Sequence, residues 1–446
     1  MTKKINIIGA GLAGSEAALY LAPLGYDINL FEMRPLVDTT VHKTENFGEL
    51  VCSNSLGSFD KESASGLLKH EALLLGSNLF KIALNKKVPS GNSLSVARED
   101  FAKEITEKIN TYPNIKIIRE EITEIDLETP TIVATGPLTS DKLSNFIVNL
   151  FGEENHNFYD AVAPIVRKDS IDFNSAFWAS RWDKGDKDFI NCPLNEDEYE
   201  KFYNFLINAE KITDVNLKSS SFFESCLPIE VLASRGFDTL RFGPMKPVGL
   251  FDRRLDGDFK KYQFHAVIQL RQDDKIADMY NLVGFQTNLK WSEQKKLLQL
   301  VPALKNVEIV RYGVMHKNSF INSPKILNPT LQTKKYKNLF FAGQVTGTEG
   351  YSESIAGGLF GAINIDRYLK NKKLITLTDT SMLGALMSYI SYPEHTNFQP
   401  INSNWGIINK DNLDRKLLKN KKEKNIVLSK RALAYIESVK EEINEN

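Results

Sequence analysis

A glycine-rich segment between two short apolar segments constrains the fold of this chain more than any other feature. Residues 5–8 are apolar and predict a buried parallel strand, and the sequence GAGLAG follows at residues 9–14. Residues 15–24 are rich in Ala and Leu and predict a helix that ends at Gly25. Residues 28–32 predict a second strand that ends in an acidic side chain. This order predicts a βαβ unit that binds a dinucleotide.

Each glycine has a physical role in such a unit. Gly9 allows the tight turn, Gly11 lets a pyrophosphate approach the backbone, and Gly14 lets helix and strand pack closely. The N-terminus of the helix offers free N–H groups and the positive end of its dipole to phosphate. Glu32 is placed to accept hydrogen bonds from a ribose hydroxyl.

Two later parts of the chain favour FAD over NAD. Residues 131–136 predict a strand that ends in Ala-Thr-Gly, and residues 338–344 predict another strand that ends in small residues. Residues 354–361 predict the start of a glycine-rich helix, which would face the flavin and its ribityl chain. Together these segments resemble the FAD-binding pattern of glutathione-reductase-like flavoproteins, in which both ends of the chain close around one FAD.

The length of 446 residues is too great for one ordinary core. Glycine patterning gives way to many aromatic residues after about residue 140 and returns after about residue 304. We therefore expect an α/β fold, with a glutathione-reductase-like FAD-binding Rossmann domain and an inserted α+β domain. The expected division is 1–140 for the first part of the FAD-binding domain, 141–304 for the inserted domain, and 305–446 for the second part with a C-terminal helical tail.

Composition and charge exclude several classes of protein. The chain has 56 basic and 56 acidic residues, so it is not a globally basic nucleic-acid binder, and any RNA surface must be local. We expect no membrane contact and a cytoplasmic location, because no apolar stretch approaches membrane-spanning length and no secretory signal begins the chain. The sequence has no CxxC pair and no HExxH, so we expect no metal site. No stable protein partner is inferred.

Three cysteines, an odd and sparse set, indicate a reducing compartment rather than a disulfide framework. Cys52, Cys192 and Cys226 are by default buried small hydrophobes. Thiols in a chain that binds a flavin also suggest redox chemistry or nucleophilic catalysis.

The phrases around the glycines and cysteines resemble one family, the folate- and flavin-dependent RNA (uracil-5-)-methyltransferases called TrmFO. The resemblance covers nearly the whole chain, and the matching segments are residues 9–18, 31–35, 50–56, 134–140, 242–250, 269–273, 311–316, 343–347 and 397–400. It implies these cofactor-binding residues: Gly9, Gly11, Gly14, Glu32, Arg34, Thr135, Gly136, Gly343, Gln344, Gly347 and Gly357.

The resemblance implies methylation without S-adenosylmethionine. In this family 5,10-methylenetetrahydrofolate supplies a one-carbon unit to C5 of a uridine in RNA. Reduced FAD supplies the electrons that complete the methyl group, and NADH or NADPH reloads the flavin.

The resemblance also assigns roles to side chains. The thiol matching Cys226 adds to C6 of the uracil, which makes C5 nucleophilic, and the thiol matching Cys52 later removes the C5 proton. Cys192 is interpreted as a buried thiol. His316 is a candidate to stack on the folate pteridine. Arg271, Lys246 and Arg311 are candidates to bind phosphate or the folate glutamate.

One departure from the family pattern bears on the RNA substrate. Residues 56–58 are Leu-Gly-Ser, where the family has Leu-Arg-Ser. The family default is the T-loop uridine of tRNA, and the alternative is a uridine of 23S ribosomal RNA. An NAD(P)H-dependent flavin oxidoreductase without methyl transfer and a non-catalytic RNA-binding flavoprotein are the competing functions.

Overall fold

Five parallel strands form the sheet that carries the glycine-rich segment. A computed structural model describes residues 3–39, 41–153, 156–183, 186–212, 227–254, 264–395, 398–411, 413 and 420–444. The strands lie in the order β16, β7, β1, β2, β6, and every neighbouring pair is parallel. Their bounds are β1 Lys4–Ile8, β2 Asp27–Glu32, β6 Ile115–Arg119, β7 Thr131–Val133 and β16 Leu339–Phe341. Because β16 comes from the C-terminal part of the chain, both parts close one sheet, as predicted.

The helix after β1 begins earlier than predicted. Helix α1 spans Leu12–Leu21, and a 3-10 turn at Ala22–Leu24 follows it. The sequence placed the helix start at residue 15, three residues too late, because the glycines hid the first turn. Gly25 ends the segment with φ +85, the left-handed conformation that favours glycine after a helix. The predicted stop is therefore confirmed.

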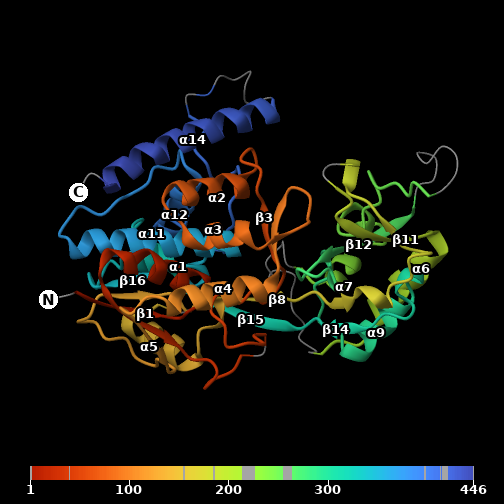
Figure 1. The fold of residues 1–446 in the computed structure, drawn as a ribbon, viewed down its shortest axis with the longest axis horizontal. Coiled ribbons are helices and arrows are strands. Elements are labelled where there is room, and N and C mark those ends of the chain that lie inside the picture. The colour runs from red at the N-terminus through yellow and green to blue at the C-terminus, as the bar shows by residue number, and fades with distance from the viewer. Residues whose placement is uncertain are drawn as a thin grey trace.

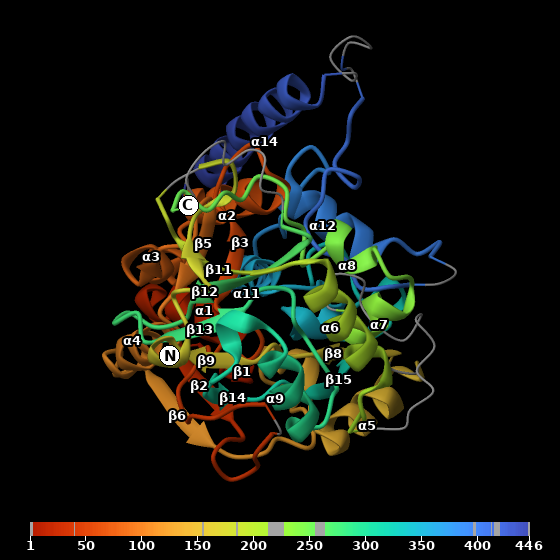
Figure 2. The same ribbon diagram turned by 90° about the vertical axis from the view of Figure 1, so that its right-hand side faces the viewer.

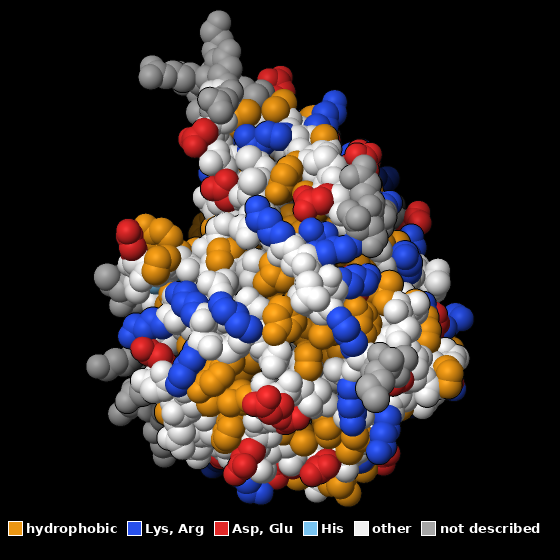
Figure 3. Space-filling view, turned by 90° about the vertical axis from the view of Figure 1, so that its left-hand side faces the viewer, with side chains coloured by type: hydrophobic (Ala, Val, Ile, Leu, Met, Phe, Trp, Pro, Cys, Tyr) orange, Lys and Arg blue, Asp and Glu red, His pale blue; other side chains and the backbone are white. Residues whose placement is uncertain are grey.

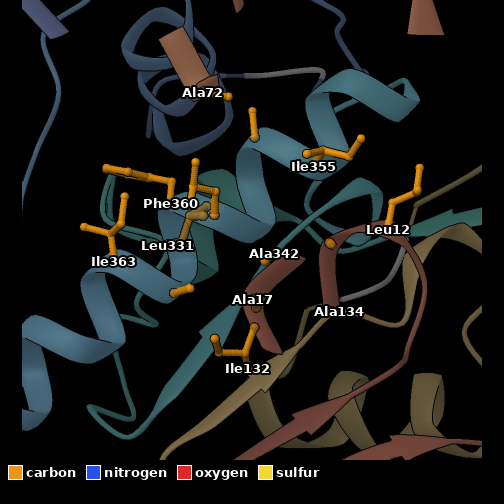
Figure 4. Close-up of a cluster of buried hydrophobic side chains, with 14 of the residues drawn as sticks. Leu12, Ala17, Ala72, Ile132, Ala134, Leu331, Ala342, Ile355, Phe360 and Ile363 are labelled. Atoms are coloured by element: carbon orange, nitrogen blue, oxygen red, sulfur yellow. The ribbon is translucent and has the colours of Figure 1, made fainter. Parts of the chain in front are cut away.

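Helix α11, Tyr351–Leu369, packs along α1 and also contacts α2. The helix predicted over residues 354–361 is confirmed, but it begins three residues earlier than predicted, because Gly350 is its N-cap. Figure 4 shows Ile355, Phe360 and Ile363 of α11 in a buried cluster with Ile132 of β7 and with Ala342, which follows β16. The surrounding helices are α2 Ala64–Leu74, α3 Asn78–Asn85, α4 Arg98–Asn110, α5 Asp141–Phe151, α12 Met382–Ser391 and α14 Lys421–Asn444. Helix α14 lies across α2, and the two chain ends lie on the same side (Figure 1).

A second, antiparallel sheet has its own hydrophobic core. Its strand order is β10, β11, β12, β13, β9, β14. The bounds are β9 Ile165–Arg167, β10 Phe177–Trp178, β11 Phe189–Leu194, β12 Ala266–Gln272, β13 Met279–Leu282 and β14 Ile309–Arg311. Figure 2 shows this part with helices α6 Glu196–Asn208, α7 Ile229–Ser234, α8 Thr239–Phe242 and α9 Trp291–Gln299. The sequence division at residues 140 and 304 stays a prediction; β14 lies beyond 304 and pairs with β9.

Two smaller sheets lie between these parts. Strands β8 His156–Ala161 and β15 Met315–Phe320 pair antiparallel and run from one part to the other (Figure 1). Strands β3 Ser55–Ser58, β4 Lys87–Val88 and β5 Ser93–Val96 form the other sheet. Cys52 lies just before β3, so this arrangement places its segment near both main sheets.

Candidate active site

The glycine-rich loop after β1 has the geometry of a phosphate-binding turn. Gly9 has φ +98, and a Cβ there would lie 2.7 Å from the carbonyl oxygen of Ala134. A Cβ at Gly14 would lie 1.8 Å from the carbonyl oxygen of Gly9, so α1 packs against the turn too closely for any side chain. At Gly11 a Cβ would meet no protein atom within 4 Å. The loop is therefore closed by the protein at Gly9 and Gly14 and left open at Gly11, beside the N-terminus of α1.

A pocket runs along the carboxyl ends of the parallel strands, where ligands bind in folds of this class. Predicted residues that line it are Gly9, Gly11, Glu32, Arg34, Thr135, Gly136 and Gln344. The lining also includes Val51, which precedes Cys52, together with Tyr351 and Ser354 from the first turn of α11. Predicted residues from four separate segments of the chain therefore line one pocket, and Val51 of the Cys52 segment lines the same pocket.

Glu32 and Arg34 organise the end of β2. The Glu32 carboxylate accepts hydrogen bonds from the backbone N–H of Ala10 at 3.2 Å and from Nε of Arg34 at 3.0 Å. Arg34 also donates to Glu49 at 3.1 Å and to the backbone oxygens of Thr44 and Asn46. Arg34 therefore holds the 44–49 segment against the pocket, and Glu49 is a pocket residue that the sequence motifs did not indicate.

Three predicted cofactor-binding glycines make packing contacts outside this lining. A Cβ at Gly343 would lie 2.7 Å from Ala13 Cβ, and a Cβ at Gly347 would lie 2.6 Å from the ring of Phe398. A Cβ at Gly357 would lie 3.3 Å from the backbone nitrogen of Gly343. These contacts support a packing role, and cofactor binding by these glycines stays a prediction.

The Cys52 segment is held by hydrogen bonds to its backbone. The N–H of Cys52 donates to the Tyr351 hydroxyl at 2.7 Å, and the thiol donates to the carbonyl of Ala161 at 3.6 Å. Arg98 donates to the carbonyl oxygens of Leu50 at 2.5 Å and Cys52 at 3.3 Å. The thiol is therefore fixed between α11, the β8 strand and the N-terminus of α4.

Arg98 and Asp273 form a buried ion pair behind Cys52. Two nitrogens of Arg98 reach the two carboxylate oxygens of Asp273 at 3.1 and 2.9 Å, in bidentate geometry. Burial lowers the pKa of Arg98, but Asp273 outweighs burial, so the pKa is raised above its ordinary value. Burial raises the pKa of Asp273, but Arg98 dominates and the pKa is lowered. Both groups are thus kept charged inside the protein.

Two predicted ligand-binding arginines also contact the Cys52 segment. Arg271 donates to Asn54 Oδ1 at 3.1 Å and Ser53 Oγ at 3.2 Å, and Arg311 donates to the carbonyl oxygens of Val41 and Val51. Burial, reinforced by Arg98, lowers the pKa of Arg271 to about 10 and also lowers the pKa of Arg311. Three guanidinium groups, those of Arg98, Arg271 and Arg311, therefore surround the Cys52 segment, and the carboxylate of Asp273 is paired with Arg98.

Asn54 and Asn281 link these groups, and neither was indicated by the sequence. Asn281 Nδ2 donates to Asn54 Oδ1 at 3.0 Å and to Asp273 Oδ1 at 3.1 Å. Asn54 Nδ2 in turn donates to the backbone oxygens of Val96 and Gln272. The network joins residues far apart in the sequence, so short motifs carry no signal for it.

The segment that departs from the family pattern has its own basic group. Gly57 has φ +80, and a Cβ there would lie 2.8 Å from Ser65 Oγ and 3.7 Å from Lys69 Nζ. Lys69 is fully buried and donates to the backbone oxygens of Ser58 and Ser65. Burial lowers its pKa to about 8. The structure therefore places an ammonium group beside Gly57 that was not predicted.

The remaining predicted residues are Lys246, His316, Cys226 and Cys192. Lys246 lies exposed on a loop of the second part. His316 lies on β15, paired with Asp160 of β8, and its side chain lies outside the described residues. Cys226 also lies outside the described residues. Cys192 is buried in the core of the second sheet, so its interpretation as a buried thiol is confirmed. Burial raises the pKa of this thiol.

Surface charge is mixed on the face at the left of Figure 1. Figure 3 shows basic and acidic side chains interspersed there with exposed hydrophobic ones. Within the described ranges, no group of three or more His, Cys, Asp and Glu side chains is arranged to hold a metal ion. No helix of the described chain is long and apolar enough to cross a membrane.

Comparison with known proteins decides the family. A family model described as GIDA, glucose inhibited division protein A, matches residues 4–373. The methylenetetrahydrofolate--tRNA-(uracil-5-)-methyltransferase TrmFO of Bacillus velezensis is 48% identical over 439 residues, which cover 98% of this chain and 99% of that protein. The TrmFO of Bacillus mycoides is 48% identical over 437 residues, with coverage of 98% and 99%. The chain belongs to the TrmFO family. The resemblance found in the sequence is therefore confirmed.

A solved structure agrees with the fold of this TrmFO family member. GidA of Aquifex aeolicus superposes with a TM-score of 0.70 at 18% identity, covering 99% of this chain and 73% of that chain. At this identity the likeness concerns the fold alone. It confirms the predicted class, an α/β protein with a Rossmann domain of the FAD-binding, glutathione-reductase-like type and an inserted α+β domain.

Proposed function

We propose that this chain methylates C5 of a uridine in tRNA, with 5,10-methylenetetrahydrofolate as the one-carbon donor, reduced FAD as the reductant, and NADH or NADPH as the source of electrons. The observation that carries the proposal is the 48% identity to the Bacillus velezensis enzyme over 98% of this chain. The names of these relatives, which are tRNA (uracil-5-)-methyltransferases, support tRNA rather than 23S rRNA as the substrate. We also propose that the protein acts in the cytoplasm.

The residues of the pocket fit FAD. The space left open at Gly11 accommodates a pyrophosphate beside the N-terminus of α1, and Glu32 at the end of β2 suits a ribose hydroxyl. Thr135, Gly136 and Gln344 would hold the remainder of the molecule toward the Cys52 segment. When bound, FAD supplies the electrons that convert the one-carbon unit to a methyl group.

Cys52 is proposed to remove the proton from C5 of the uridine. A thiol acts as a base only as the thiolate, which nearby cations favour. Arg98 and Arg271 supply that positive charge, and the hydrogen bond from the Cys52 N–H to Tyr351 fixes the position of the segment. Arg271 and Arg311 are therefore proposed as positioning residues for this segment.

Cys226 is proposed to add to C6 of the uracil, and this role rests on the family resemblance. His316 is proposed to stack on the folate pteridine on the same basis. Lys246, which is exposed, is proposed to meet a phosphate of the RNA or the folate glutamate.

Mass spectrometry of RNA from a strain that lacks the gene tests the proposal. We expect 5-methyluridine to disappear from total tRNA and to remain in 23S rRNA. Wild-type protein should restore it, and Cys226→Ala should not. Loss of 5-methyluridine from 23S rRNA alone would favour the ribosomal substrate, and unchanged RNA of both kinds would refute the proposed function.

A further inference from the structure

Trp182 is an exposed aromatic side chain that the fold holds in one position. Its side chain is 56% exposed, and it lies in the 3-10 turn Arg181–Asp183. The backbone is left-handed at Trp182, with φ 60, and at Asp183, with φ 48, a conformation uncommon for residues other than glycine. The N–H of Trp182 donates to the carbonyl of Gly249 at 2.7 Å.

The indole ring of Trp182 packs directly against the backbone of Gly249. Its φ is +80, and a Cβ there would lie 2.6 Å from Cε2 and 2.8 Å from Nε1 of Trp182. The edge of Phe251 meets the ring at a centroid distance of 6.4 Å. The indole is thus supported on one side by protein and open to solvent on the other, which is the arrangement of a preformed contact surface.

The surroundings of Trp182 combine apolar and basic groups. Val248 is 48% exposed, and Lys246 on the same loop is also exposed. The guanidinium of Arg181 donates to the carbonyl oxygens of Lys246 and Val248, and so ties this loop to the turn that carries Trp182. An aromatic ring beside a cation suits a nucleotide, because the base can stack on the ring and the phosphate can pair with the cation.

Strand β12 connects this surface to the Cys52 segment. Arg181 donates to Gln269 Oε1 at 2.9 Å, and Arg271, two residues further along β12, donates to Ser53 and Asn54 beside Cys52. Residues two apart on a strand share a face and are about 7 Å apart. The turn that carries Trp182 therefore contacts, through Arg181, the same face of β12 as the Cys52 segment, two residues away along the strand.

We propose that Trp182 is the stacking platform for an unpaired base next to the target uridine, with Lys246 meeting the phosphate between them. The proposal rests on the proposed function and adds the part of the RNA that the protein recognises. Proteins that recognise specific RNA sequences mostly read unstacked bases in loops, which stack on aromatic rings. A ring already held against Gly249 loses little conformational freedom on binding.

Kinetics of purified holoenzyme variants with a full-length tRNA transcript test this role. Trp182→Ala should raise KM for tRNA roughly 5- to 150-fold, the loss of one stacked base, and leave FAD content and kcat nearly unchanged. Trp182→Phe should recover most of the affinity, because a ring is retained. The matched control is Trp291→Ala, since Trp291 is 57% exposed in the same part of the chain but stacks on Tyr312 at 5.2 Å.

A tRNA carrying 2-aminopurine beside the target uridine gives a direct reading of stacking. Its fluorescence should be quenched by the wild-type protein and by Trp291→Ala, and not by Trp182→Ala. Unchanged KM and quenching in Trp182→Ala would overturn the proposal while leaving the proposed function intact. Equal losses in both tryptophan variants would also overturn it. A wild-type protein that forms no 5-methyluridine would instead refute the proposed function.

Discussion

Replacing Gly11 with Val should separate cofactor binding from folding. Gly11 has φ −70 and ψ −164, an extended conformation that any residue adopts, and a Cβ there meets no protein atom within 4 Å. We expect the stability of the apoprotein to change by no more than about 1 kcal/mol, the cost of a poorer helix N-cap. The valine methyl groups would occupy the space proposed for the pyrophosphate.

The loss of affinity follows from the contacts that the phosphates would make. A hydrogen bond to a charged group contributes about 1.5–3 kcal/mol, so loss of two such bonds costs about 3 kcal/mol or more. This corresponds to at least about a 100-fold weaker Kd for FAD. Titration of apoprotein with FAD, followed by flavin fluorescence, measures it.

Two other glycines provide the controls. Gly25→Ala places a side chain at φ +85 in open space, so it should cost about 1 kcal/mol of stability and leave FAD affinity unchanged. Gly14→Ala should damage the loop itself, because its Cβ would lie 1.8 Å from the Gly9 oxygen. An FAD affinity in Gly11→Val within threefold of wild type would refute the assigned pyrophosphate position.

Three further results are expected. Arg98→Ala should lower the free energy of unfolding by about 3–5 kcal/mol in urea denaturation, because Asp273 stays buried without its partner; a loss below 1 kcal/mol would contradict this. Burial raises the pKa of Glu71 from 4.5 to about 7, so the folded state binds the Glu71 proton more tightly than the unfolded state does. The contribution of Glu71 to the unfolding free energy should therefore fall by up to about 3 kcal/mol as pH rises from 4.5 to 7. Glu71→Gln should make that pH profile less steep, and parallel profiles would exclude Glu71 as a cause. Burial also raises the pKa of Glu16 to about 7, so Glu16 keeps part of the slope in the variant. With RNA carrying 5-fluorouridine, Cys52→Ala should trap a covalent complex on denaturing gels and Cys226→Ala should not; an adduct mapped to Cys52 would reverse the two roles.

Local backbone requirements explain what the sequence predicted well. The turn at Gly9, the close packing at Gly14 and the helix stop at Gly25 each depend on a few neighbouring residues, and the structure has all three. The strand that returns at residues 339–341 was also predictable, because a buried parallel strand is a continuous apolar run.

Contacts between distant segments explain what the sequence missed. The sequence indicated a glycine-rich helix at residues 354–361 but not its packing partner. A Cβ at Gly358 would lie 2.3 Å from the carbonyl oxygen of Ala13, so close packing of α11 against α1 requires a glycine there. The contact of Arg271 with the Cys52 segment was not predicted, and its role in binding a ligand stays a prediction. Its partner Asn54 is separated from it by 217 positions, a pairing that no local pattern encodes.

Reconstitution with a labelled one-carbon donor tests the central claim most directly. Purified protein is incubated with a tRNA transcript, FAD, NADPH and methylenetetrahydrofolate labelled with carbon-13 in its methylene group, and the nucleosides are analysed by mass spectrometry. We expect 5-methyluridine one mass unit heavier than the unlabelled nucleoside, formed only when folate and reductant are both present. Label that enters 5-methyluridine from S-adenosylmethionine in the absence of folate would contradict it.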